Sequence, residues 1–228
     1  MITIVIPTLN AAESLPHCLS CLEKMEQDKI ACIIICDGGS KDATKNKAKA
    51  NGAKVIETAP GRGQQLHQGA LEAKTEWILF LHADTHLSSH ADKVIDRFIT
   101  NPENKFRAGY FRFKLDDGSN EARKLERQVA WRCEKFALPY GDQALLINRD
   151  FYNQLGGYKN IALMEDVDLI WRIEKLYGKQ ALVLLDADAT TSAQKFQRDG
   201  YFKRSGRNLF CLFLFWIKVP PHLIVKLY

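Results

Sequence analysis

The chain has 228 residues, of which 46% are hydrophobic and 26% are charged, and its formal net charge is +5. This composition is typical of a globular protein, and the length suits one large α/β domain or two small ones. The modest positive charge does not require a polyanionic partner, and no nucleic-acid-binding motif accompanies it. No apolar run reaches the roughly 20 residues that a membrane-spanning helix needs, and the N-terminus lacks the basic region of a signal peptide.

The first half of the chain alternates short apolar, β-branched runs with helical segments. The expected strands are residues 2–6, 30–36, 53–57 and 77–81. The expected helices are residues 13–25, 40–50 and 61–74, with Ser40 as the N-cap of the second helix. This alternation predicts a parallel sheet with helices on both faces.

The second half of the chain follows a different pattern. Residues 108–115 alternate aromatic and basic side chains, which suits an edge or antiparallel strand. Residues 121–137 are an expected amphipathic helix, whose apolar stripe consists of Leu125, Val129, Cys133 and Phe136. Further expected elements are strands at 144–148 and 181–185, a helix at 165–176 and a helical tail from Gln197. We expect one fused domain with a nucleotide-binding half (about 1–115), an acceptor half (about 116–195) and a tail (196–228).

Four of the six cysteines have spacings that leave two interpretations open. Cys18 and Cys21, followed by Cys32 and Cys36, fit a zinc pattern. The first pair, however, falls on a predicted helix beside leucines, and the second pair points to one face of an apolar strand. We favour buried, reduced thiols of a cytosolic protein.

Polar loops follow each of the four early strands. They are residues 7–10 (Pro-Thr-Leu-Asn), 37–40 (Asp-Gly-Gly-Ser), 60–63 (Pro-Gly-Arg-Gly) and 82–85 (His-Ala-Asp-Thr). In doubly wound sheets, ligands bind at the carboxyl ends of the strands. The sequence therefore predicts a ligand site at this edge of the sheet, and two of its loops carry carboxylates.

The order of these loops resembles the family 2 glycosyltransferases. Residues 5–10 and 36–44 resemble the opening of that family, and residues 81–85 stand where it has an Asp-x-Asp motif. Residues 164–169 (Met-Glu-Asp-Val-Asp-Leu) look like its Glu-Asp motif at a helix start. The resemblance covers about residues 2–176. The form of the loops is also similar to a short bacterial branch, named radical-SAM/selenodomain-associated transferase 2.

The resemblance implies the GT-A fold, a Rossmann-like mixed sheet with helices on both faces. It also implies transfer of a sugar from a nucleotide-diphosphate sugar to an acceptor hydroxyl by direct displacement with inversion. The positions expected to bind nucleotide or substrate are Pro7, Thr8, Asn10, Glu13, Asp37, Gly38, Arg62, His82, Ala83, Asp142 and Glu165.

Three of these positions have a second interpretation. Asp37 can accept a hydrogen bond from a base N–H, such as uracil N3–H, or serve as a turn residue before two glycines. Arg62 opens a helix in a Gly-flanked loop, where it can hold phosphate oxygens or remain a solvated loop residue. Asp142 is a second acidic candidate for binding acceptor or sugar hydroxyls, and a covalent nucleophile role also stays open.

Two aspartates carry the expected chemistry. Asp84 is the expected ligand of Mg²⁺ or Mn²⁺, which would neutralise the charge of the departing diphosphate. His82 replaces the first aspartate of that motif and either touches ribose or phosphate or packs at the strand end. Asp166 is the expected general base that removes a proton from the acceptor hydroxyl. A helix N-terminus attracts acidic residues in any case, and this is the alternative for Asp166.

The tail combines basic residues with an apolar run at 209–217. Such a segment can lie on an anionic membrane, which would suit a lipid-linked acceptor, or it can pack on the domain or in a dimer. The expected location is the cytoplasm, with the inner face of the membrane as the site of peripheral contact through residues 197–228.

Two rival functions remain. A nucleotidyltransferase needs a Gly-rich, Arg-containing loop directly after the first strand, where this chain has residues 7–10. A non-catalytic nucleotide- or membrane-binding module is supported by His82 and Cys36, which stand at positions that are often acidic. The retained Asp84 and Asp166 argue against it. A dehydrogenase is disfavoured because no Gly-x-Gly-x-x-Gly follows the first strand.

Overall fold

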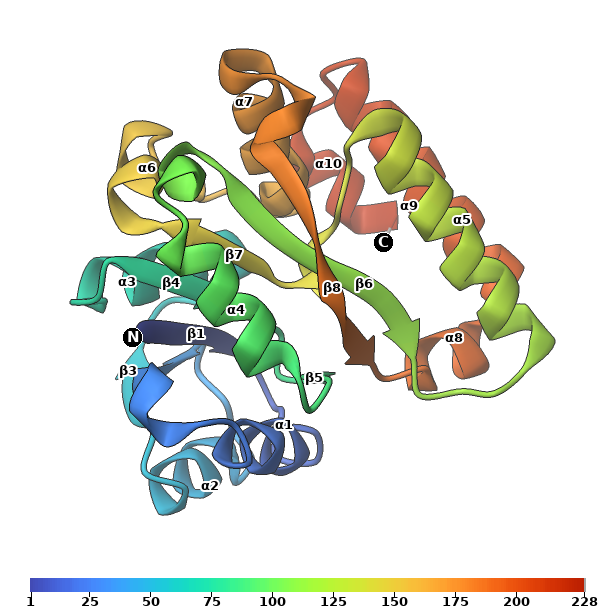
Figure 1. The fold of residues 1–228 in the computed structure, drawn as a ribbon. Coiled ribbons are helices and arrows are strands. Elements are labelled where there is room, and N and C mark those ends of the chain that lie inside the picture. The colour runs from blue at the N-terminus through green and yellow to red at the C-terminus, as the bar shows by residue number, and fades with distance from the viewer. Residues whose placement is uncertain (228) are drawn as a thin grey trace.

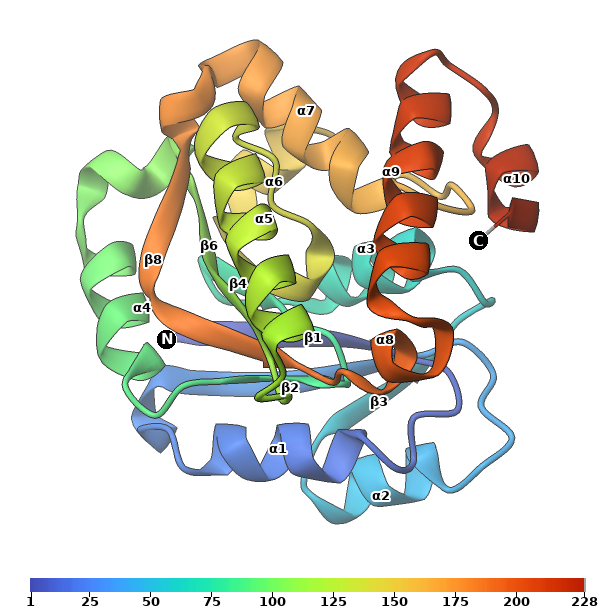
Figure 2. The same ribbon diagram turned by 90° about the vertical axis from the view of Figure 1, so that its right-hand side faces the viewer.

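The computed structural model describes residues 1–227, and its eight strands form one mixed sheet (Figures 1 and 2). The strand order is β3-β2-β1-β4-β7-β6-β8-β5. The parallel part contains β1 (Ile2–Thr8), β2 (Ile30–Asp37), β3 (Lys54–Glu57) and β4 (Trp77–Phe80). The rest contains β5 (Thr85–Leu87), β6 (Ala108–Leu115), β7 (Leu145–Asn148) and β8 (Leu182–Thr191). This arrangement confirms the predicted mixed α/β sheet.

The first strand sets the register of the edge where the polar loops meet. β1 is β-branched and apolar, as expected of a strand that is covered on both faces. It pairs in parallel with β2, so that Thr8 lies opposite Asp37. β2 in turn pairs in parallel with β3. The carboxyl ends of these strands therefore reach the same edge, as the sequence predicts.

Helices cover both faces of the sheet and enclose two apolar cores. One core contains side chains of α1 (Leu15–Glu23), α2 (Thr44–Ala50) and α4 (Ala91–Thr100). The other contains side chains of α3 (Arg62–Glu72), α5 (Asn120–Phe136), α6 (Arg149–Gln154) and α7 (Glu165–Tyr177). Figure 2 shows α1 and α2 on one side of β1 and β2, and α5, α7 and α9 on the other.

The C-terminal part is helical, as expected, but it is divided into separate helices. It consists of α8 (Gln194–Asp199), α9 (Tyr201–Trp216) and α10 (Pro221–Ile224). Gly200, at φ 84°, separates the first two. Residue 228, the last of the predicted tail, lies outside the described residues. Among residues 1–227, no helix is long and apolar enough to cross a membrane.

Several details differ from the sequence-based expectations. Residues 108–115 are an interior strand and not an edge, because β6 pairs with both β7 and β8. The strand expected at 181–185 continues to Thr191, and α4, α6 and β5 were not predicted. Ser40 does not cap α2, since its backbone N–H and Oγ both donate to Asp37. Phe136 is 52% exposed, whereas the rest of its predicted stripe is buried.

Four of the six cysteines are buried, and Cys21 and Cys32 are partly exposed. All six are free, and Cys18 and Cys36 belong to different apolar cores on opposite faces of the sheet. Among residues 1–227 no group of three or more His, Cys, Asp or Glu is arranged to hold a metal. The structure therefore favours the second of the two interpretations of the cysteine spacing.

Gly69 is the point where α3 packs most tightly on the sheet. A Cβ added there would lie 2.3 Å from Val5 Cγ1 and 2.6 Å from Cys36 Sγ. We therefore expect Gly69→Ala to lower the free energy of unfolding by about 1–3 kcal/mol, measured by urea unfolding. Gly206→Ala in α9 is the matched control, because a Cβ added at that position meets no atom within 4 Å. The higher helix propensity of alanine should raise the free energy of unfolding of this variant by roughly 0.5–1 kcal/mol. Equal stability of the two variants would contradict the packing argument.

Candidate functional site

A buried carboxylate joins the loops that follow β1 and β2. Asp37 Oδ1 accepts hydrogen bonds from Thr8 Oγ1 (3.0 Å) and Ser40 Oγ (2.5 Å). Its Oδ2 accepts from the backbone N–H groups of Gly39 (3.0 Å) and Ser40 (2.8 Å). Burial alone would raise the pKa of Asp37, but these hydrogen bonds lower it below its ordinary value. The carboxylate is therefore held ionised, and it fixes the shape of the loop.

Two amide side chains tie the same loops together. Asn10, at φ 51°, donates its backbone N–H to Ser40 Oγ and accepts from the Lys41 backbone N–H through Oδ1. Gln65 Nε2 donates to the backbone oxygens of Thr8 and Cys36, at 2.7 Å each. Gln65 is not among the predicted site residues. The sequence feature that could have identified it is an amide side chain in the first turn of a helix that starts at the strand-end edge.

Gly38 and Pro7 belong to this arrangement, whereas Glu13 stands apart. Gly38 donates its N–H to the Thr8 carbonyl, and an added Cβ would lie 3.1 Å from Gln65 Nε2. Pro7 is half-buried at the end of β1. Glu13 is exposed in the segment between β1 and α1.

An ion pair joins the start of α3 to the start of α7. The guanidinium of Arg62 donates to the carboxylate of Glu165, which is 1% exposed. Burial raises the pKa of Glu165, and the positive charge of Arg62 opposes this effect. The helices approach closely because residue 63 is glycine. A Cβ there would lie 3.1 Å from Glu165 Cβ and 2.2 Å from the backbone oxygen of Lys159, in the segment before α7.

The first turn of α7 also places Asp166 at the centre of the site. Its Oδ1 accepts from the Val167 backbone N–H, and its Oδ2 accepts from the Gly141 backbone N–H, at 2.8 Å each. His82 lies against the same glycine, because a Cβ on Gly141 would be 2.8 Å from His82 Nε2 and 3.3 Å from Asp166 Oδ2. Burial and, to a smaller extent, Arg62 lower the pKa of His82 to about 4. The imidazole is therefore neutral at pH 7.

Asp84 follows β4 and pairs with a lysine from the far end of the chain. Lys195 Nζ lies 3.0 Å from Asp84 Oδ2, and the Ser192 backbone N–H donates to the Asp84 carbonyl. Burial would raise the pKa of Asp84, but Lys195 and His82 lower it below its ordinary value. Ala83 is buried beside it. Lys195 is not among the predicted site residues, since in the sequence it is one of several basic residues near the start of the tail.

Asp142 lies in a short 3₁₀ helix (Gly141–Gln143) next to this cluster. Its Oδ1 is buried and has no hydrogen-bond partner among the described residues. Burial raises the pKa of Asp142 to about 6, Arg132 opposes this, and the charge of Asp166 adds to it. Asp168, by contrast, forms ion pairs with Lys159 and Arg172 and supports the segment before α7.

Most of the predicted site residues therefore fall into two adjoining groups. Strand-end loops bring together the first group, Pro7, Thr8, Asn10, Asp37 and Gly38. The second group surrounds Gly141 and the start of α7 and consists of Arg62, His82, Asp84, Asp142, Glu165 and Asp166. The second group combines a neutral imidazole, several carboxylates and a guanidinium. Such a set can hold a charged, oxygen-rich ligand and move a proton.

The chain matches a known protein family over most of its length. Residues 3–157 match the family described as Glycosyl transferase family 2. A PGL/p-HBAD biosynthesis glycosyltransferase of Mycobacterium tuberculosis is 34% identical over 94 residues, which are 38% of this chain and 36% of that protein. An uncharacterized glycosyltransferase of the same organism is 34% identical over 84 residues, or 36% of each chain. The matched segments thus span about a third of these relatives.

Solved structures with the same fold include glucosyl-3-phosphoglycerate synthase from Mycobacterium tuberculosis. In its complex with phosphoglyceric acid, the TM-score is 0.64 at 16% identity, over 84% of this chain and 70% of that one. The same enzyme has been solved with Mn²⁺, uridine-diphosphate and glucosyl-3-phosphoglycerate, with a TM-score of 0.60 at 17% identity. TarS of S. aureus gives a TM-score of 0.63 at 14% identity, over 99% of this chain and 42% of that one. These likenesses confirm the predicted GT-A fold.

The raised pKa of Asp142 predicts a pH-dependent cost to folding. Between its ordinary value of 3.8 and about 6, rising pH ionises this side chain in the unfolded chain before the folded one. Stability is therefore lost across that window, and the loss is complete above it. We expect Asp142→Asn to remove the loss, which is on the order of 3 kcal/mol above pH 6.

Urea unfolding at pH 4 and pH 7 tests this expectation. The stability difference between Asp142→Asn and the unchanged chain should grow with pH. Asp150→Asn, at an exposed aspartate outside this cluster, is the control for the substitution itself. A stability difference between Asp142→Asn and the unchanged chain that is the same at pH 4 and pH 7 would contradict the raised pKa of Asp142.

Proposed function

Because the chain belongs to glycosyl transferase family 2, we propose that it transfers a sugar from a nucleotide-diphosphate sugar to an acceptor hydroxyl. The observation that carries the proposal is the meeting of Arg62, Asp84 and Asp166 at the strand-end edge, each on a different element. A structural scaffold has no need to gather such charges at the place where α/β sheets bind ligands. The proposed division into a nucleotide half, an acceptor half and a tail follows from the same placement.

We propose that the nucleoside lies over the loops after β1 and β2. Thr8, Asn10 and Gly38 provide the surface of these loops, with Pro7 and Glu13 at their margins. A carboxylate has about four acceptor sites, and Asp37 uses four of them inside the protein. Its proposed role is therefore to hold the loop that receives the base. This is the second of the two interpretations of Asp37 given by the sequence, that of a turn residue before two glycines.

The diphosphate would lie between Arg62 and Asp84. Mg²⁺ is often bound by one or two carboxylates together with substrate phosphates and water, so a single aspartate fits this ion or Mn²⁺. Asp84 would hold the cation, and neutral His82 and the backbone at Ala83 would border it. When bound, the cation supplies positive charge for the departing phosphate oxygens. Solved structures of glucosyl-3-phosphoglycerate synthase contain Mn²⁺ or Mg²⁺ with uridine-diphosphate, which supports this proposal.

Asp166 is the proposed general base. It lies in the first turn of α7, and the hydrogen bond from Gly141 to Oδ2 fixes its orientation. An acceptor hydroxyl that donates to this carboxylate would lose its proton as its oxygen attacks the anomeric carbon, with inversion. Asp142 would bind acceptor or sugar hydroxyls, because burial leaves its Oδ1 without a partner in the described chain. Glu165 positions Arg62.

The remaining proposals concern the acceptor and its location. The acceptor is proposed to be lipid-linked, and the protein to work in the cytoplasm with peripheral membrane contact through residues 197–228. Exposed apolar side chains of the tail support this, among them Phe210, Ile217 and Leu223. Of the basic residues of α9, Arg204 and Arg207 pair with Asp199, and Lys203 is the exposed one that can face an anionic surface.

The proposed cation site gives the first test. Calorimetric titration with uridine-diphosphate and related nucleotides should show binding that Mn²⁺ strengthens. Asp84→Ala should weaken it at least tenfold and abolish the metal effect, because the one protein carboxylate at the cation is lost. Asp150→Ala on α6 is the control and should bind normally. Failure of the folded, unchanged chain to bind any nucleotide would instead favour a non-catalytic module.

The base assignment gives the second test. Asp166→Asn should retain nucleotide binding but lower the rate at which nucleotide-diphosphate is released from the donor sugar by about 10²–10⁴-fold. Asp168→Asn is the matched control, since its carboxylate pairs with Lys159 and Arg172 and should affect stability alone. Unchanged turnover in Asp166→Asn would refute the base role.

A further inference from the structure

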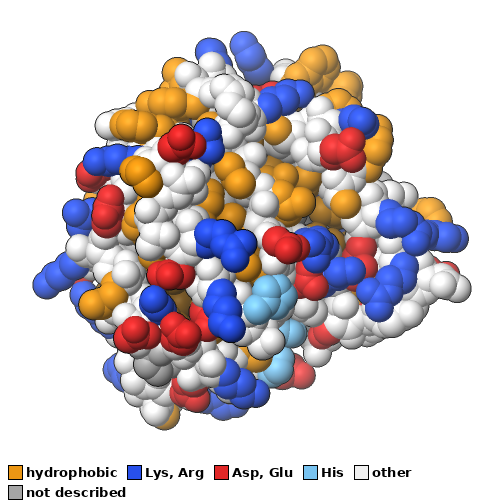
Figure 3. Space-filling view, in the orientation of Figure 1, with side chains coloured by type: hydrophobic (Ala, Val, Ile, Leu, Met, Phe, Trp, Pro, Cys, Tyr) orange, Lys and Arg blue, Asp and Glu red, His pale blue; other side chains and the backbone are white. Residues whose placement is uncertain are grey.

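A large apolar groove runs between α5, α7 and α9. Its volume is about 890 Å³, which lies in the range of small-molecule binding sites. Its lining is mostly aliphatic and aromatic, and includes Val129 of α5, Trp171 of α7 and Leu212 of α9. Figure 3 shows hydrophobic side chains and basic side chains close together on the upper right of the molecule, over these helices.

One end of the groove reaches the candidate active site. Tyr140 and Asp142 line it there, and Gly141 between them donates its N–H to Asp166. Asp142 and Asn208 both line the groove, and the Oδ1 of each is a buried acceptor without a hydrogen-bond partner in the described chain. Of the two residues, Asp142 lies at the end that reaches the candidate active site. A ligand with one hydroxyl and a long apolar body matches this distribution of groups.

The charged side chains that line the groove are two of each sign, Arg132 and Lys179 against Asp142 and Glu174. Arg132 lies over the Tyr140 ring, 3.5 Å from its centroid, and donates to the Leu138 carbonyl. Glu174 and Lys179 lie 3.9 Å from each other. The groove therefore presents little net charge to its occupant, which favours a neutral hydrocarbon over a peptide or a nucleotide.

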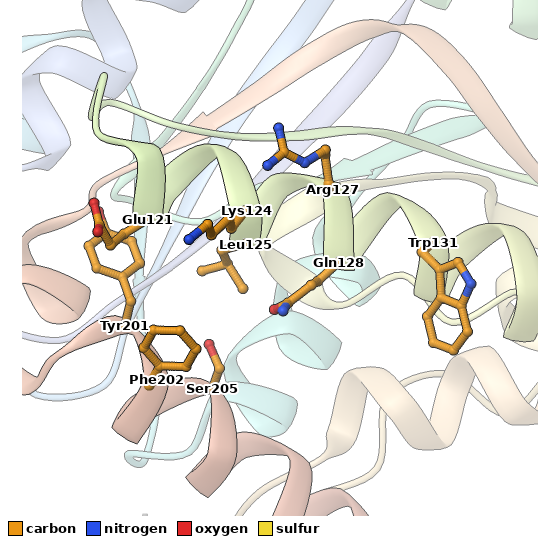
Figure 4. A pocket seen from close by; sticks show the side chains of 9 residues that line it. All are labelled: Glu121, Lys124, Leu125, Arg127, Gln128, Trp131, Tyr201, Phe202 and Ser205. Atoms are coloured by element: carbon orange, nitrogen blue, oxygen red, sulfur yellow. The ribbon is translucent and has the colours of Figure 1, made fainter.

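The groove continues along α5 into a second hollow of about 350 Å³ (Figure 4). Leu125 and Trp131 of α5 border it on one side, and Tyr201 and Phe202 of α9 on the other. Charged side chains of α5 also line this hollow, namely Glu121, Lys124 and Arg127. Trp131 is 55% exposed and Phe202 is 80% exposed, so large apolar surfaces stand open along this path. Exposed apolar areas of this kind mark binding surfaces.

We propose that this groove binds the hydrocarbon chain of the acceptor. The acceptor is then a long-chain, amphipathic alcohol whose hydroxyl lies at Asp142, within reach of Asp166. This inference rests on the proposed transferase function for the identity of the reacting hydroxyl, but binding of the chain does not require the donor. In this proposal, α9 forms the outer wall of the acceptor subsite.

Gly206 provides a way to close the groove without disturbing the fold. It lines the groove on α9, and an added Cβ meets no atom within 4 Å. Gly206→Leu should fill the channel, whereas Gly206→Ala should leave it open. Three tryptophans, Trp131, Trp171 and Trp216, line the groove and report on its occupant.

The experiment is a fluorescence titration with 12-bromododecan-1-ol, whose bromine quenches tryptophan on contact. Saturable quenching at a ratio of one to one is expected for the unchanged chain and for Gly206→Ala. At least tenfold weaker binding is expected for Gly206→Leu, with a urea midpoint no lower than that of the unchanged chain. Asp84→Ala should bind the alcohol normally, so that failure of the nucleotide site and failure of the groove are distinguishable.

Three outcomes would overturn the inference. The first is equal quenching in Gly206→Leu and the unchanged chain. The second is quenching that appears only when the protein is bound to vesicles of phosphatidylglycerol and phosphatidylcholine, which would make this face a membrane surface. The third is self-association, seen by sedimentation, that shields the tryptophans from the alcohol. This result would make the groove a contact between copies of the chain.

Discussion

The ion pair between Arg62 and Glu165 is the interaction on which the geometry of the site depends. A carboxylate that is almost fully buried needs a charged partner, because its desolvation is otherwise costly. The partner comes from the start of α3, and Gly63 allows the two helices to approach. The start of α7 is thereby fixed against the nucleotide half. Asp166, the next residue along the chain, is placed by the same contact.

Charge is distributed unevenly around this pair. His82 stands where the family has an acidic residue, and burial keeps its imidazole neutral at pH 7. Asp142 is held closer to protonation by burial, whereas Asp84 is kept ionised beside Lys195. Arg62 and Lys195 offset the charges of Glu165 and Asp84, so the cluster is less negative than its count of carboxylates suggests. A diphosphate can approach such a site with less repulsion than it would meet from four ionised acids.

The sequence predicts much of this arrangement, and the reasons for its failures are physical. The strand-end loops were predictable because parallel strands bring their carboxyl ends to one edge. Lys195 was not, since it lies 111 residues from Asp84 and no local pattern records that contact. Residues 108–115 alternate as an edge strand does, but pairing on both sides by distant strands makes them interior. The assignment to the radical-SAM/selenodomain-associated branch stays a prediction.

The contact between Lys195 and Asp84 has a practical consequence for handling the protein. The lysine already neutralises the carboxylate at 3.0 Å, so the empty protein keeps no unpaired charge at this position. Proteins whose metals replace a hydrophobic core unfold when the ion is chelated. This chain instead builds two apolar cores of its own. It can therefore be purified in the presence of a chelator and reconstituted afterwards with a chosen ion.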